Sequence, residues 1–288
     1  MAQNVLDLLQ YGWVQNMFWA ALLAGLACGL IGTYVVVRRV VFISGGIAHT
    51  TFGGVGFAYW LQSEFLLGWF DPILGALTFA LGSAIIISSP FVRERMREDS
   101  TIGVLWVVGM ALGVLFLNYV DRSKVLVQDT SSILFGNILF ISDDELLVML
   151  MMVIGILAVV MVLYKDLQIL TFDEEFAQVS GINVGLMTLI LFGLIAVTTV
   201  MLVKVVGVVL VIALLTIPAS IAGLYTKDLR GMMMMGTVIA VLLTSAGLVI
   251  SLAYDTPSGA TIVMVLGAAF LVAMTASALR RKATVRSS

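Results

Sequence analysis

Long apolar runs constrain this chain more strongly than any other feature of its sequence. Residues 184–225 carry a single charge, at Lys204. As one straight helix this run would be about 63 Å long, which is roughly twice the hydrocarbon thickness of a bilayer. We therefore expect the run to cross a membrane twice and to fold back near residues 204–207.

Comparable runs recur along the whole sequence, near residues 17–37, 46–61, 73–90, 101–120, 146–164, 184–203, 205–225, 232–253 and 259–279. The chain is 61% hydrophobic and only 11% charged, with a mean hydropathy of +1.13, so little remains for a water-soluble domain. The sequence predicts an all-α polytopic membrane protein with eight or nine transmembrane helices in a single domain, residues 1–288. The apolar piece 133–141 is too short to cross and is expected to be re-entrant or interfacial.

The basic residues predict the orientation of these helices. With the N-terminus outside, three of the 15 basic residues fall in outer loops, namely Arg122, Lys124 and Lys204. The remaining 12 (15 − 3) fall on the other side: Arg38, Arg39, Arg93, Arg95, Arg97, Lys165, Lys227, Arg230, Arg280, Arg281, Lys282 and Arg286. Because lysine and arginine concentrate in cytoplasmic loops, this second side is predicted to be cytoplasmic.

Several function classes are excluded by what the sequence lacks. It contains no HExxH, GxSxG or GxxxxGK[ST] motif, so neither an intramembrane protease nor an ATPase is predicted. The net charge of −2 gives no basic surface for nucleic acid. We therefore expect a chain without catalysis of its own, which needs a partner to energise any active transport.

The longest hydrophilic insertion on the basic side is residues 165–183. Thr171 followed by Glu174 matches a capping box, and Gly181 suits the left-handed position after a helix. This pattern predicts a short helix over 172–180.

The apolar residues of that helix form one stripe, since Phe172, Phe176 and Val179 recur at i, i+4 and i+7. Such a helix either lies on the membrane interface or docks into a groove of a partner. The run Glu175-Phe-Ala-Gln-Val-Ser-Gly181 resembles the Glu-Ala-Ala-x-x-x-Gly loop by which membrane subunits of ABC importers dock onto their ATPase subunits, with Phe176 in place of the first alanine. The resemblance implies that the residues that contact or orient the ATPase are Phe172, Glu175, Phe176, Ala177, Val179 and Gly181.

Four further stretches, residues 38–56, 134–139, 206–219 and 257–263, together resemble the zinc, manganese and iron ABC importer permease family. The resemblance implies a type II ABC importer fold in a prokaryotic cytoplasmic membrane. It also implies three protein partners: a second copy of the chain, an ATP-binding subunit and an external metal-binding protein. No cofactor is expected in the chain itself, because the divalent metal is cargo and ATP is bound by the partner.

His49 is the leading candidate for a metal contact. It lies about ten residues beyond Arg39, which places it roughly 15 Å into the membrane. Imidazole binds zinc and the late transition metals, although a lone histidine can also serve only as a hydrogen-bonding group between helices. Related permeases carry a Ser-Asp-x-x-Ser-His pattern here, and this chain has Gly45 and Ala48 at the matching positions. Loss of that carboxylate favours weak contacts along a pathway over a tight site.

Asp255 is the best remaining carboxylate for a second metal contact, and the alternative is a turn residue or a helix N-cap. The run 232–235, four consecutive methionines, cannot converge on one ion from a helix and is interpreted as apolar filler. Pro218 and Gly223 predict a kinked or broken helix.

These observations predict the membrane-spanning subunit of an ATP-driven importer for zinc, manganese or iron, and they do not choose among the three metals. The alternatives are an ion-coupled secondary carrier or channel, and a structural membrane protein without a transport role.

Overall fold

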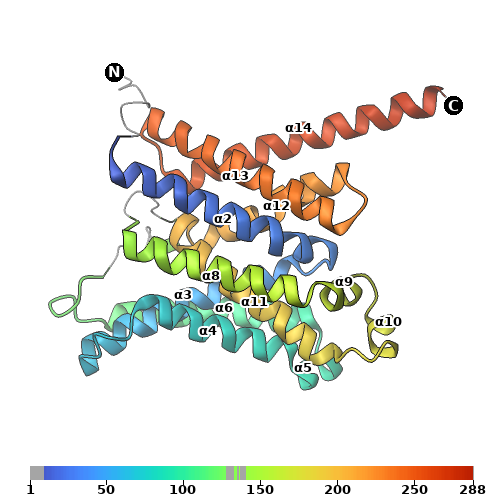
Figure 1. Ribbon diagram of the computed structural model, residues 1–288. Helices are drawn as coiled ribbons and strands as arrows, with labels where there is room; N and C mark the ends of the chain where they lie inside the picture. The colour runs from blue at the N-terminus through green and yellow to red at the C-terminus, as the bar shows by residue number, and fades with distance from the viewer. Residues whose placement is uncertain (1–9, 128–132, 135, 137–140, 288) are drawn as a thin grey trace.

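A computed structural model describes residues 10–127, 133, 134, 136 and 141–287 of the chain as a bundle of helices (Figure 1). The described part contains no strand. Its helices are α2 (Gly12–Val37), α3 (Val41–Phe65), α4 (Pro72–Ser88), α5 (Pro90–Arg95), α6 (Glu98–Tyr119), α8 (Asp143–Val162), α9 (Tyr164–Phe172), α10 (Glu174–Val179), α11 (Val184–Val206), the 3₁₀ turn η2 (Val208–Leu210), α12 (Val211–Tyr225), α13 (Leu229–Tyr254) and α14 (Ser258–Ser287).

Seven helices among the described residues are long and apolar enough to cross a membrane: α2, α3, α6, α8, α11, α13 and α14. Two shorter apolar helices, α4 with 17 residues and α12 with 15, complete the set. At 1.5 Å per residue α4 is about 26 Å long, and α12 together with η2 reaches about 29 Å, so both approach the bilayer thickness. The prediction of an all-α membrane fold with eight or nine transmembrane helices is confirmed.

The fold-back expected near residues 204–207 is also confirmed. Helix α11 ends at Val206, and Gly207 follows with a φ of +79° before η2 and α12 begin. By contrast, α12 continues through Pro218 and Gly223, so the helix is not broken there, and the alternative of a kink stays a prediction. The missing hydrogen bond at Pro218 is tolerated because the side chains of this stretch are packed in the core.

The predicted re-entrant piece 133–141 falls largely outside the described residues. Within the described part, Gly136 lies against the fold-back, because a Cβ added there would collide with the backbone of Val206 and Gly207.

Helix α3 is enclosed by its neighbours through close backbone contacts. A Cβ added at Gly53 would stand 2.8 Å from the carbonyl oxygen of Gly109, and one at Gly56 would stand 2.7 Å from that of Gly113. Real Cβ atoms do not approach so closely, so α3 and α6 pack at a distance that only glycine allows. Helix α4 covers another side of α3 in the same manner. The helix that carries His49 is therefore rigidly held.

The two ends of the bundle carry different loops. In Figure 1, α5, α9, α10 and the C-terminal end of α14 lie at one end, and α2 begins at the opposite end. The loops predicted to be cytoplasmic thus gather on one side. Which side of a membrane that end faces stays a prediction.

Candidate functional site

The side chain of His49 is buried inside the helical bundle, 6% exposed. It lies eight residues beyond the start of α3, or about 12 Å along the helix. Its ring stacks on the indole of Trp106 from α6, with ring centroids 4.2 Å apart and an angle of 20° between the planes. Among the described residues the buried Nδ1 atom has no hydrogen-bond partner.

The glycine one turn before His49 makes room for this stack. A Cβ added at Gly45 would stand 2.7 Å from Cζ3 of Trp106 and 2.8 Å from Cδ1 of Ile212. Residues i and i+4 share one face of a helix, so the indole occupies the space that a side chain at Gly45 would need. Sequence reasoning missed Trp106, because nothing in the pattern of α6 indicates which residue of α3 it faces.

The hydroxyl groups near His49 are already hydrogen-bonded. Thr50 donates to the carbonyl oxygen of Ile47 at 2.8 Å and accepts from Ser83 of α4 at 2.8 Å, while Thr51 donates to the carbonyl oxygen of Ala48. The imidazole nitrogen is therefore the available ligand atom at this point of α3. Its lone pair lies in the ring plane, so stacking on the indole covers the face of the ring and leaves the coordinating direction unused.

Asp255 lies far from His49 along the bundle. It is the exposed C-cap of α13, with a left-handed φ of +51°, at the turn into α14. Gly25 and Gly29 of α2 pack on Val241 and Thr237 of α13, so α13 begins where α2 ends and α3 begins. Asp255 follows the last residue of this 26-residue helix and therefore lies about 20 Å or more further along the axis than His49. The N-cap alternative is wrong, since Asp255 follows a helix. The structure does not bring the two residues together, and the described residues contain no cluster of three or more metal-ligating His, Cys, Asp or Glu side chains.

The methionines at 232–235 diverge as predicted. Met232 and Met233 are buried, whereas Met234 is exposed. They therefore present no common set of sulfur ligands.

The hydrophilic insertion folds as two short helices, α9 and α10, and not as one helix over 172–180. Helix α9 continues through Phe172, so Thr171 is a helical residue whose hydroxyl donates to the carbonyl oxygen of Leu167 at 2.6 Å. The N-cap of α10 is Asp173, whose Oδ1 accepts from the backbone N–H of Phe176 at 2.9 Å. The capping box predicted at Thr171 is wrong, because a second capping residue two positions later takes that role.

The end of α10 agrees with the prediction. Gly181 has a φ of +81°, its N–H donates to the carbonyl oxygen of Gln178 at 3.1 Å, and the N–H of Ile182 donates to that of Ala177 at 3.0 Å. This pair of hydrogen bonds is the Schellman motif. Ala177 itself is fully buried and anchors α10 to the bundle.

The predicted apolar stripe is exposed, although it comes from two helices joined at Asp173. Phe172 is 61% exposed, Phe176 57% and Val179 87%. Glu175, between them, is also exposed. We refer to α9 and α10 with these residues as the docking segment.

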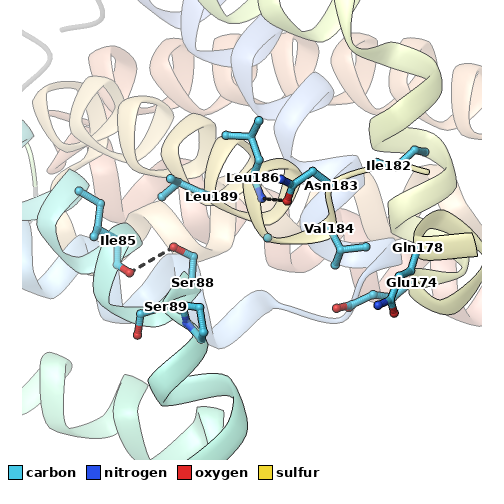
Figure 2. Close-up of a pocket in the computed structure, with 12 residues that line it drawn as sticks. Ile85, Ser88, Ser89, Glu174, Gln178, Ile182, Asn183, Val184, Leu186 and Leu189 are labelled. Carbon is cyan, nitrogen blue, oxygen red and sulfur yellow. Dashed lines mark hydrogen bonds between the residues drawn. The ribbon is translucent and has the colours of Figure 1, made fainter. Parts of the chain in front are cut away.

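A groove of about 930 Å³ lies beside the docking segment. Figure 2 shows Ser88 and Ser89 at the α4–α5 junction on one side and Glu174 and Gln178 of α10 on the other. The groove is lined by Ile85, Ser88, Ser89, Pro90, Glu174, Gln178, Ile182, Asn183, Val184, Gly185, Leu186 and Leu189.

A polytopic bundle with one buried imidazole and an exposed docking segment at its basic end is typical of the membrane-spanning subunit of a transporter. Residues 10–277 match the ABC 3 transport family, and the chain belongs to it. The family resemblance read from the sequence is confirmed. The chain is a membrane subunit of an ATP-binding-cassette transport system and not an enzyme, since ATP hydrolysis in such systems lies in a separate subunit.

Individual relatives match over nearly their whole length. The chain is 37% identical to an uncharacterised membrane protein of Synechocystis over 95% of this chain and 94% of that one. It is 34% identical to the manganese transport system membrane protein MntC of Halalkalibacterium halodurans, over 93% of this chain and 88% of the relative. Among solved structures, a chain of PsaBC from Streptococcus pneumoniae in complex with Fab matches with a TM-score of 0.82 and 28% identity, covering 95% of both chains.

Proposed function

We propose that this chain is the permease subunit of an importer that carries a divalent transition metal ion into a prokaryotic cytoplasm. The observation that carries the proposal is the buried imidazole of His49, whose Nδ1 has no hydrogen-bond partner among the described residues. An unsatisfied polar atom at membrane depth is costly, and imidazole nitrogen is a preferred ligand of borderline metals. Manganese is the first metal to test, because relatives are named for manganese transport; zinc and iron follow.

The docking segment supports the proposed partnership with an ATP-binding subunit. Three large apolar side chains are exposed on it, and Gly181 fixes where the segment ends. The free energy of the complex falls when a partner covers these apolar side chains and removes them from water. A second copy of the chain and an external metal-binding protein complete the proposed assembly, in which Asp255 on the outer side is the first contact for the ion.

The proposed mechanism uses the burial of His49. In this conformation the imidazole is buried and Trp106 covers one of its faces, so an ion reaches Nδ1 only after α3 and α6 move together relative to α12. A single nitrogen ligand binds weakly enough for the ion to leave again toward the cytoplasm.

Uptake of radioactive manganese into proteoliposomes tests the proposal. The vesicles contain this chain with its ATP-binding subunit and enclose ATP, and the external metal-binding protein delivers the ion. We expect accumulation that stops when the enclosed ATP is replaced by a non-hydrolysable analogue. Accumulation driven by an ion gradient without ATP would instead favour the secondary carrier or channel.

A further inference from the structure

Arg38, the C-cap of α2, joins three helices with one side chain. Its Nη2 donates to Oε2 of Glu174 at 3.1 Å and to the hydroxyl of Thr188 at 3.2 Å. Its guanidinium carbon lies 5.8 Å from the ring centre of Phe192. Glu174 begins α10, and the other two residues belong to α11. The Arg38 side chain is 12% exposed and that of Glu174 is 41% exposed, so the pair lies at the edge of the bundle and is partly screened by solvent.

The groove makes this contact important for α10. On the side that faces the α4–α5 junction, Glu174 and Gln178 border open space and not a packed helix (Figure 2). Helix α10 has six residues and is anchored in the core by Ala177. The Arg38–Glu174 pair therefore joins the start of α10 to the end of α2 beside this groove.

The corner that follows Arg38 leads directly to the helix of His49. Arg39 has a φ of +61°, a conformation that a non-glycine residue holds only when its surroundings impose it. Hydrogen bonds from Arg38 and Val40 to the last turn of α2 brace the corner, and α3 starts at the next residue. A corner this short and this constrained passes a displacement on to α3, which the glycine contacts hold as a rigid body.

We propose that the Arg38–Glu174 pair transmits movement of the docking segment to α3 and so to His49. Arg38 is a positioning residue in this scheme, since it touches neither the ion nor ATP. The inference rests on the proposed function, because it needs an ATP-binding subunit that pulls or pushes α10. It names one structural element, the corner between α2 and α3, whose position depends on both the docking segment and the ion site.

The test compares charge variants of the complete complex in proteoliposomes. The variants are Arg38→Glu, Glu174→Arg and the double exchange, and Asp99→Asn on α6 is the matched control that removes an exposed carboxylate outside the docking segment. Three quantities are measured: the ATP-binding subunit retained on purification, the rate of ATP hydrolysis, and the manganese ions taken up per ATP hydrolysed.

We expect each single exchange to retain the ATP-binding subunit and to hydrolyse ATP, while manganese uptake per ATP falls by about fivefold or more. The double exchange restores the pair with opposite polarity and should recover most of the ratio of manganese ions to ATP, and Asp99→Asn should match the wild type. A helix that merely failed to fold would lose the ATP-binding subunit as well.

Three results would overturn the proposed transmission, which we call the link. They are an unchanged ratio of manganese ions to ATP in the single variants, loss of the ATP-binding subunit from those variants, and a ratio in the double exchange that is no higher than in either single variant. Absence of ATP-driven uptake by the wild-type complex would refute the proposed function, and the link with it. Wild-type uptake with equally efficient single variants would refute the link alone.

Discussion

The left-handed cap of the docking segment gives the most direct test of how this chain engages its ATP-binding subunit. We consider replacement of Gly181 by valine. At a φ of +81° an L-residue with a Cβ costs about 1–2 kcal/mol more than glycine. A Cβ at Gly181 meets no atom within 4 Å, so no steric clash with neighbouring helices adds to this cost.

This penalty acts on the two hydrogen bonds that end α10. A cost of about 1–2 kcal/mol changes the ratio of capped to uncapped segments by roughly 5- to 30-fold. An uncapped segment no longer presents Phe176 and Val179 at a fixed angle. We therefore expect Gly181→Val to weaken binding of the ATP-binding subunit by up to that factor, with the transmembrane helices inserted as before.

Binding of the purified ATP-binding subunit to the permease in nanodiscs measures the effect. Gly181→Asn is the graded control, because asparagine tolerates the left-handed region better than other side chains. Gly185→Ala is the positional control, because that glycine is helical and its added Cβ would meet only Asn183, at 3.6 Å. Wild-type affinity in Gly181→Val, or equal losses in the valine and asparagine variants, would refute the reasoning.

Three further outcomes are expected. His49→Gln should lower metal uptake, most strongly for zinc and iron, at limiting external metal while leaving the membrane level unchanged, because the amide offers no imidazole nitrogen; full uptake of all three metals would contradict the metal contact. A cysteine at Arg95 should resist an impermeant thiol reagent in intact cells while one at Glu64 is labelled, and the reverse pattern would invert the orientation. Gly54→Ala should lower the free energy of unfolding in detergent by about 1–3 kcal/mol because its methyl group meets the backbone of α4, whereas Gly155→Ala on α8, with open space around it, should be nearly silent in the same thermal melt.

The features that could be predicted from the sequence are those set by local chemistry. Apolar length determined the transmembrane helices, and the left-handed turns at Gly181 and Gly207 follow from glycine's freedom at positive φ. The prediction of where α10 starts was wrong for an equally local reason. Thr171 and Asp173 are both good capping residues, and only the length of α9 decides between them.

The contact on which the proposed coupling rests joins residues far apart in the chain. Glu174 is separated from Arg38 by 136 positions, and no periodicity in either segment indicates that α2 and α10 meet. The docking residues themselves were recognisable because their motif is continuous in sequence. What the motif could not supply is the partner of Glu174, which depends on how the helices pack.

Gly45 illustrates how packing changes the meaning of a residue. In the sequence this glycine is a position without the polar side chain of related permeases, and by itself it indicates only that a ligand is missing. In the structure the lack of a side chain at Gly45 leaves room for Trp106, which stacks on His49. A carboxylate at position 45 and an indole over His49 therefore exclude each other, since the first Cβ atom would already stand 2.7 Å from the ring. In the proposed ion site one imidazole lies beside an aromatic ring, so the affinity of that site for a metal ion depends on this pair.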